Sequence, residues 1–381
     1  MLDRRAFVAT SGLGALALGF APRFAFAGAP TAKRFVFIIQ RGAADGLGTI
    51  APTGDPAFAG LRGAFAEDFA TGAKLDPMFT LHPQLPAVAD LFQQRQALFA
   101  HAIASPYRDR SHFDGQNILE TGAAGAYQVT DGWLNRLLGL LPDDAAKAIA
   151  LSATVPLALR GPHEVTSYAP SNLPQASDDL LQRVGMMYDG DAQLHGLWNE
   201  AISTRALAAD APADSGRNGA AAGTLAAKLL LPAGGARIAM IETGGWDTHA
   251  GQRARLGNQL KGLDAMIAAL KVGLGPVWGQ TMVLVATEFG RTAAVNGTGG
   301  TDHGTASCAM LLGGSVRGGR ILSDWPGLAP AALYEGRDLK PTMQLDSFIA
   351  GAVGAHFGVD PGKLMSVLFP GTSGRPVEGL I

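Results

Sequence analysis

The chain has 381 residues, of which 47% are hydrophobic and 16% are charged, and its formal net charge is -2. This composition supplies enough apolar material for one large folded domain and differs from that of disordered chains. The mildly acidic balance argues against nucleic acid as the main partner. The single cysteine, Cys308, excludes an internal disulfide. Because it lies in an apolar run over residues 306–312, we expect an inert, buried thiol.

The first 27 residues have the features of a twin-arginine export signal. Arg4 and Arg5 precede an apolar segment from about Val8 to Ala21, and Ala25-Phe26-Ala27 has the small-x-small form of a cleavage site. We therefore expect recognition by the Tat export machinery, cleavage before Gly28, and a periplasmic or secreted mature protein. The apolar segment is shorter than the roughly 20 residues that span a bilayer. We expect no stable membrane span after signal cleavage.

Strand-like apolar runs alternate with helical periodicity along the mature chain. Strands are expected at Arg34–Gln40, 97–103, 149–152, 236–241, 281–286 and 309–312, and helices at 85–95, 111–119 and 253–271. This order predicts a doubly wound, mostly parallel α/β sheet flanked by helices. Residues 155–235 are richer in Pro, Ala, Asp and Gly, and we expect a helical cap or insertion there, within a single domain over residues 28–381.

Polar motifs follow several of the expected strands or lie in glycine-rich loops. They are Arg41-Gly42-Ala43-Ala44-Asp45-Gly46-Leu47, Arg110-Ser111-His112-Phe113-Asp114, Gly245-Trp246-Asp247-Thr248-His249, Glu288-Phe289-Gly290-Arg291 and Gly299-Gly300-Thr301-Asp302-His303-Gly304. The carboxyl ends of parallel strands meet at one edge of the sheet, where α/β folds build their ligand sites. The motifs therefore predict one shared site.

These motifs resemble the DUF1501 family of exported bacterial proteins, over almost the whole mature chain. That family is in turn similar to the superfamily of alkaline phosphatases, sulfatases and cofactor-independent phosphoglycerate mutases. The resemblance implies an alkaline-phosphatase-like fold. It also implies a metal-dependent hydrolase that acts on a phosphate or sulfate ester, either a small molecule or a glycan.

The resemblance implies metal ligands at six positions, namely Asp45, Asp247, His249, Glu288, Asp302 and His303. Asp45 would be the carboxylate that follows the first strand, although it lies five residues beyond Gln40. A turn aspartate is the alternative for Asp45. Glu288 would be the carboxylate at the end of strand 281–286, or one half of an ion pair with Arg291. Phe289 cannot be a ligand, so one expected nitrogen is missing.

The other expected ligands combine carboxylates with imidazoles. Asp247 and His249 are two residues apart, so their side chains would point the same way from an extended segment. Asp302 is either a ligand or the partner that orients the His303 imidazole. A mixed oxygen and nitrogen set favours zinc or manganese, whereas an oxygen-rich site with Asp45 would suit magnesium or calcium.

The nucleophile implied by the resemblance lies at the start of a helix that ends at Thr121-Gly122. Ser111 is the natural hydroxyl, at a helix N-terminus where backbone N–H groups favour a bound anion. The superfamily spacing of ten residues before the glycine instead gives His112. Both are known nucleophile types, and Ser111 as a simple helix cap is the alternative. Arg110 and Arg291 are candidates for contacting the anionic group.

Two readings from other classes remain. A degenerate, non-catalytic envelope protein would bind a glycan or an assembly partner, and Phe289 and the altered ligand spacing favour it. A serine esterase is disfavoured because the sequence contains no Gly-x-Ser-x-Gly elbow. Nucleotide use is disfavoured because Walker and Rossmann glycine patterns are missing from the sequence. His82 and His101 are expected to be structural.

Overall fold

The structure is a computed structural model that describes residues 32–142, 147–169, 178–188, 190–207 and 218–381. The expected export signal over residues 1–27 lies outside the described residues. Within them, no helix is long and apolar enough to cross a membrane.

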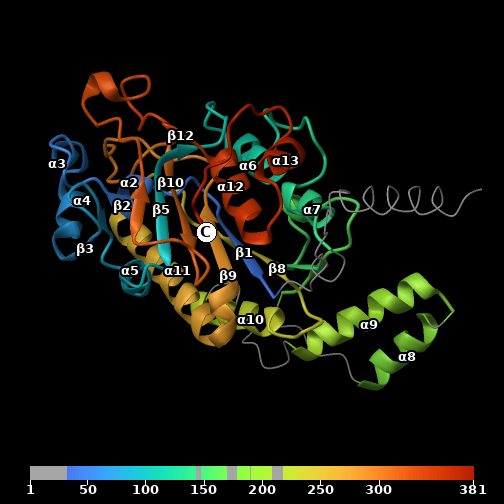
Figure 1. Cartoon of the computed structure of the whole chain (residues 1–381). Coiled ribbons are helices and arrows are strands. Elements are labelled where there is room, and N and C mark those ends of the chain that lie inside the picture. The colour runs from blue at the N-terminus through green and yellow to red at the C-terminus, as the bar shows by residue number, and fades with distance from the viewer. Residues whose placement is uncertain (1–31, 143–146, 170–177, 189, 208–217) are drawn as a thin grey trace, which may run out of the picture. The chain divides into compact units, whose positions relative to one another are not determined.

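A sheet of nine strands forms the centre of the described part of the chain (Figure 1). Its order is β11-β5-β10-β9-β1-β8-β6-β7, and β12 pairs with β5. The strands are β1 Arg34–Gln40, β5 Ala97–Ala104, β6 Ala148–Leu151, β7 Thr166–Ser167, β8 Ile238–Thr243, β9 Thr281–Ala286, β10 Ser307–Leu312, β11 Arg320–Leu322 and β12 Met343–Gln344. All pairings are parallel except those of β10, which is antiparallel to β5 and β9. The expected mostly parallel α/β sheet is confirmed.

Helices and short strands surround this sheet. The α-helices are α2 Gly46–Thr49, α3 Phe58–Arg62, α4 Ala64–Glu67, α5 Pro86–Gln93, α6 His112–Thr121, α7 Trp133–Leu138, α8 Asp178–Tyr188, α9 Ala192–Leu207, α10 Gly219–Leu230, α11 Gln252–Leu274, α12 Leu345–Phe357 and α13 Pro361–Leu368. The 3-10 helices are η1 Asp68–Thr71, η2 Leu157–Leu159, η3 Gly275–Gln280 and η4 Pro330–Ala332. A second, three-stranded sheet consists of β2 Ile50–Ala51, β3 Ala73–Lys74 and β4 Thr80–Leu81.

The central strand β1 shows how the two faces of the sheet are covered. All seven of its residues are buried, as expected for a continuous apolar run inside a parallel sheet. Successive side chains alternate between two cores: Phe35 and Phe37 pack in the core that includes α7, α12 and α13, whereas Val36 and Ile38 pack in the core that includes α5, α10 and α11. The sheet is therefore doubly wound.

Residues 155–235, the expected cap or insertion, contribute several elements. Among those described are β7, which pairs with β6, and α10, which packs against α11. Leu225 and Leu229 of α10 lie in the same core as β1. Residues 170–177, 189 and 208–217 of this stretch lie outside the described part.

The carboxyl ends of β1, β8 and β9 lie side by side. Ile39 near the end of β1 is paired with Glu242 of β8 on one side and with Ala286 of β9 on the other. The loops that follow these strands therefore leave the sheet at one edge. Cys308, in the neighbouring β10, is buried as expected, and burial raises the pKa of its thiol to about 12.

Candidate functional site

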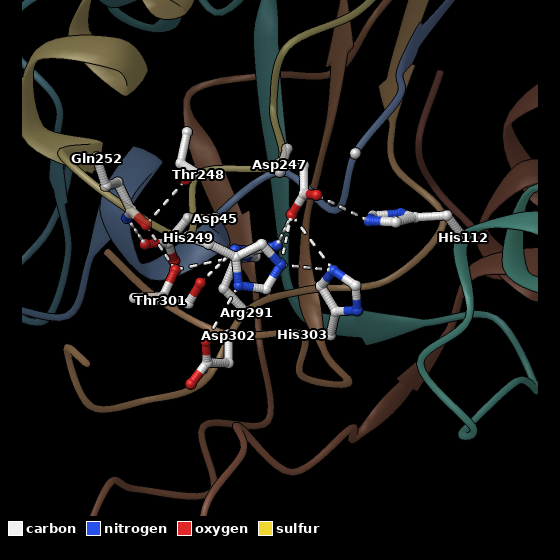
Figure 2. A network of polar contacts seen from close by, with 12 residues as sticks. Asp45, His112, Asp247, Thr248, His249, Gln252, Arg291, Thr301, Asp302 and His303 are labelled. Atoms are coloured by element: carbon white, nitrogen blue, oxygen red, sulfur yellow. Dashed lines mark hydrogen bonds and ion pairs between the residues drawn. The ribbon is translucent and has the colours of Figure 1, made fainter. Parts of the chain in front are cut away.

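Three side chains from distant segments form a group that can hold a metal ion. They are His112, Asp247 and His303, and one ligand atom from each lies within 4.8 Å of the others. His112 is the first residue of α6, Asp247 lies in the loop after β8, and His303 precedes β10. Figure 2 shows both imidazoles directed toward the Asp247 carboxylate.

Asp247 lies at the centre of this group. Its Oδ1 is 2.9 Å from Nε2 of His249 and 3.3 Å from Nε2 of His303, and its Oδ2 is 3.5 Å from Nε2 of His112. Arg291, whose side chain is fully buried, donates from Nη1 to Oδ1 over 2.6 Å. Burial alone would raise the pKa of Asp247, but the Arg291 hydrogen bond and the nearby positive charges lower it on balance. The carboxylate is therefore ionised at neutral pH.

The orientation of the His112 ring leaves one nitrogen directed at this carboxylate. Nδ1 of His112 is 2.9 Å from Oε1 of Glu288. Since an ionised carboxylate only accepts, Nδ1 must carry the proton. Nε2 is buried and has no hydrogen-bond partner among the described atoms. In the neutral imidazole, Nε2 therefore presents a lone pair toward Asp247.

His303 and His249 present lone pairs in the same way. Nδ1 of His303 is 2.9 Å from the carbonyl oxygen of Arg110, and Nδ1 of His249 is 3.0 Å from Oδ1 of Asp302. Both partners are acceptors, so both Nδ1 atoms carry protons when the rings are neutral. The two Nε2 atoms then face each other across 3.0 Å with lone pairs on both sides.

Facing lone pairs at this distance require a proton or a cation between them. Burial lowers the pKa of His303, and the charge of Arg291 lowers it further, which disfavours an extra proton on that ring. Imidazole nitrogens whose other nitrogen donates to a carboxylate or carbonyl are the usual ligands of a divalent metal. The ligand atoms of His112, Asp247 and His303 therefore fit a metal ion, and Nε2 of His249 lies beside two of them, at 3.0 Å from Nε2 of His303 and 2.9 Å from Oδ1 of Asp247.

Glu288 lies behind His112. Its carboxylate is fully buried and accepts from the Gly42 N–H over 2.8 Å, from Gln116 Nε2 over 3.1 Å and from Thr287 Oγ1 over 2.9 Å. Burial would raise the pKa of Glu288, but the hydrogen bonds, first that with His112, lower it below the ordinary value. The same hydrogen bond raises the pKa of His112. The geometry makes Glu288 the residue that orients His112.

Phe289 supplies a wall of the group instead of a ligand. Its ring stacks on His112 with centroids 5.1 Å apart and lies 5.3 Å from the His303 ring. His112, which the sequence suggested as a nucleophile, places a nitrogen in the group that could hold a metal, whereas Phe289 has none to offer.

Two other expected ligands, Asp45 and Asp302, lie outside this group. The Asp45 carboxylate is buried against the guanidinium of Arg62 and the amide of Gln252. Burial would raise the pKa of Asp45, but the Arg62 charge lowers it on balance. The Asp302 carboxylate binds His249 and accepts from Asn296 Nδ2 over 3.0 Å, and these contacts, that of Asn296 first, lower its pKa.

Ser111 lies beside the group, at the N-cap of α6. Its side chain makes no capping hydrogen bond, and its N–H donates to Tyr107 Oη over 2.9 Å. Arg110, the preceding residue, has a left-handed φ of 62°, and its guanidinium is held by Asp338 and Glu335. Both arginines proposed from the sequence, Arg110 and Arg291, are thus paired with carboxylates of the protein itself.

Comparison with known proteins identifies a family over most of the chain. A family model described as "Protein of unknown function (DUF1501)" matches residues 32–369, which confirms the resemblance seen in the motifs. No curated protein matches the sequence at a significant level.

Three solved structures show limited similarity. Ps i-CgsB in complex with k-i-k-neocarrahexaose is 10% identical, with a TM-score of 0.40 over 86% of this chain and 72% of that chain. The C-terminal periplasmic domain of EcEptC from Escherichia coli, in complex with Zn, is 8% identical, with a TM-score of 0.38 over 74% of each chain. The phosphonate monoester hydrolase of Agrobacterium radiobacter is 13% identical, with a TM-score of 0.29 over 91% and 79%. Similarity at this level is too low to carry an argument about ligands or activity.

Proposed function

We infer that this chain, which belongs to the DUF1501 family, is a metal-dependent hydrolase of phosphate or sulfate esters. The observation that supports this proposal is the convergence of three imidazole Nε2 atoms on the carboxylate of Asp247. Such a set, with each Nδ1 held by an acceptor, is built to bind a cation.

We assign the ligands to His112, Asp247, His249 and His303. Three nitrogens and one carboxylate oxygen favour zinc, with manganese as the second candidate, and disfavour magnesium and calcium, which prefer oxygen. Glu288 and Asp302 orient imidazoles in this assignment. A divalent ion bound there would supply Lewis acidity toward an ester oxygen.

His112 is assigned as a ligand because of where its nitrogen lies. Nε2 is buried, which disfavours its attack on a phosphorus or sulfur centre, and it lies within 4.8 Å of ligand atoms of Asp247 and His303. The Ser111 hydroxyl, with no capping bond at the N-terminus of α6, is the remaining candidate nucleophile. The N-terminal N–H groups of α6 favour an anion at that position.

Metal content and turnover of the purified protein test the proposal together. We expect about one zinc or manganese ion per chain, and hydrolysis of at least one ester in a panel of aryl and sugar phosphates and sulfates. Asp247→Asn should lose most of the metal and the activity, and Ser111→Ala should keep the metal but lose turnover. His163→Gln, a histidine outside the group, should behave as wild type. A wild-type protein that binds neither ion after native purification contradicts the proposal.

A non-catalytic envelope protein that binds a glycan or an assembly partner is the second candidate. It is favoured by the pairing of Arg110 and Arg291 with the protein's own carboxylates, since these cations are then already neutralised. Metal binding without turnover of any ester, together with retained binding of a glycan, would support this candidate.

We also propose export by the twin-arginine route, on the basis of Arg4, Arg5 and the apolar segment that follows. Replacement of both arginines by lysine should retain the precursor in the cytoplasm, as judged by cell fractionation. Unchanged export of that variant would contradict this part of the proposal.

A further inference from the structure

The buried side chains around Asp45 form a chain of hydrogen bonds that leads to Asp247. Asp45, Arg62, Gln252, Thr301 and Arg291 are each at most 1% exposed. Figure 2 shows most of these residues on the side of Asp247 away from His112. None of them was expected to act in this way, and Asp45 was expected to bind the metal.

In this series of hydrogen bonds, the donor and the acceptor of each bond follow from the chemistry of the two partners. The Asp45 carboxylate accepts from Gln252 Nε2, so the amide oxygen of Gln252 must face the other way. That oxygen, Oε1, accepts from the hydroxyl of Thr248 over 2.9 Å and from the hydroxyl of Thr301 over 2.5 Å. The amide orientation of Gln252 is therefore fixed by charge at one end and by two hydroxyls at the other.

The hydrogen bonds continue from Thr301 through Arg291 to Asp247, a member of the group that could hold a metal. Because Thr301 donates its hydroxyl proton to Gln252, its Oγ1 offers a lone pair to Nε of Arg291, at 3.2 Å. Nη2 of Arg291 also donates to the main-chain oxygen of Thr301. With two of its nitrogens held in this way, the guanidinium presents Nη1 to Oδ1 of Asp247 over 2.6 Å.

We propose that Asp45 and Gln252 are positioning residues that act through Thr301 and Arg291 to fix the Asp247 carboxylate for the metal. The ion pair with Arg62 compensates the charge of Asp45. The Asp45 carboxylate can therefore be buried without a metal ion and can hold Gln252 in place. The metal part of this inference rests on the proposed function, whereas the geometric part stands on its own. Residues behind a metal ligand typically contribute 10- to 100-fold to metal affinity.

Gln252→Leu is the direct test, because it removes both halves of the amide and keeps the volume. We expect the zinc dissociation constant, measured by competition with a chromophoric chelator, to rise by about tenfold or more. Gln96→Leu is the control, because Gln96 is also a glutamine that accepts through Oε1, here from Nε1 of the buried Trp278 over 3.0 Å. Gln96 precedes Ala97, which pairs with Leu312 and so lies at the opposite end of the strands. Its loss should lower the melting temperature without changing zinc affinity.

Thr301→Val separates a positioning role from a general loss of stability. If the hydrogen bonds act in series as proposed, the double variant Gln252→Leu, Thr301→Val should raise the zinc dissociation constant by less than the product of the two single increases. Independent, multiplicative effects would overturn the proposal, as would wild-type zinc affinity in Gln252→Leu.

Crystal structures of the wild type and of Gln252→Leu provide a readout that needs no metal. We expect Nη1 of Arg291 to leave Asp247 in the variant, with a separation above about 3.5 Å. Retention of the wild-type contact would overturn the proposal even if the protein bound no metal. A wild type without metal but with a displaced Arg291 in the variant would overturn the proposed function alone.

Discussion

The His112 side chain illustrates how the structure can suggest another role than the one that the sequence favours. Its position at the start of α6 is that of a nucleophile, yet its ring is fixed between Phe289 and Glu288 with Nε2 buried. The decisive fact is the acceptor on Nδ1, because it determines which nitrogen carries the lone pair. That acceptor lies 176 residues further along the chain.

Glu288→Gln should weaken metal binding without unfolding the protein. An amide can accept from Nδ1 but lacks the charge that makes this hydrogen bond strong, so we expect zinc affinity to fall about 10- to 100-fold. Equilibrium competition with a chelator measures this, and circular dichroism checks the fold. Glu242→Gln, which affects an ion pair with Arg41 at the end of β8, is the control and should leave affinity unchanged. Equal effects of the two variants would contradict the assignment of Glu288.

Among the elements, β5 and α12 each bury a neutral histidine. His101 of β5 donates from Nε2 to the Ile50 carbonyl and accepts from the Ala102 N–H, both over 2.8 Å. His356 of α12 lies 2.9 Å from the Arg34 carbonyl. Burial lowers the pKa of His101 to about 4 and that of His356 to about 3. The structural role expected for His101 agrees with this environment.

These two histidines predict how stability changes with pH. The unfolded chain binds protons on both side chains below a pKa of about 6.5, whereas the folded chain does so only near pH 4 at His101 and near pH 3 at His356. The unfolding free energy should therefore fall as the pH decreases from 6.5. The slope approaches about 1.4 kcal/mol per pH unit for each group. Urea unfolding at pH 7.5, 6 and 5 measures it. His101→Gln should reduce the slope; an unchanged slope in that variant would contradict the prediction.

The sequence predicted the strands better than it predicted the side-chain contacts between segments. The apolar runs that became β1, β5 and β9 carry their own signal, because burial on both faces demands continuous hydrophobic residues. Asp247 and His303, two members of the candidate group, were also proposed from the sequence, since carboxylates and imidazoles after a strand or in a glycine-rich loop are visible there. Gln252 and Arg62 were not, because an amide in a helix and an arginine before a loop have no pattern that separates them from surface residues.

For the whole molecule, a bound metal should appear as added stability. A ligand that binds only the folded state adds about 2.7 kcal/mol when its free concentration is 100 times the dissociation constant. We expect the melting temperature of metal-free protein to rise by several degrees on addition of zinc and to return with a chelator, as measured by calorimetry. His112→Ala should show no such rise. A similar rise in that variant would place the binding elsewhere.

The four proposed ligands come from three segments, namely the start of α6, the loop after β8 and the loop before β10, and Asp247 and His303 alone are 56 residues apart. No short stretch of the chain can bring them together, because the closure of long loops costs conformational entropy that only the assembled sheet offsets. A partly folded chain would therefore not bind the metal at the proposed site. Metal binding at this edge of the sheet would therefore indicate that β1, β8 and β9 have already paired.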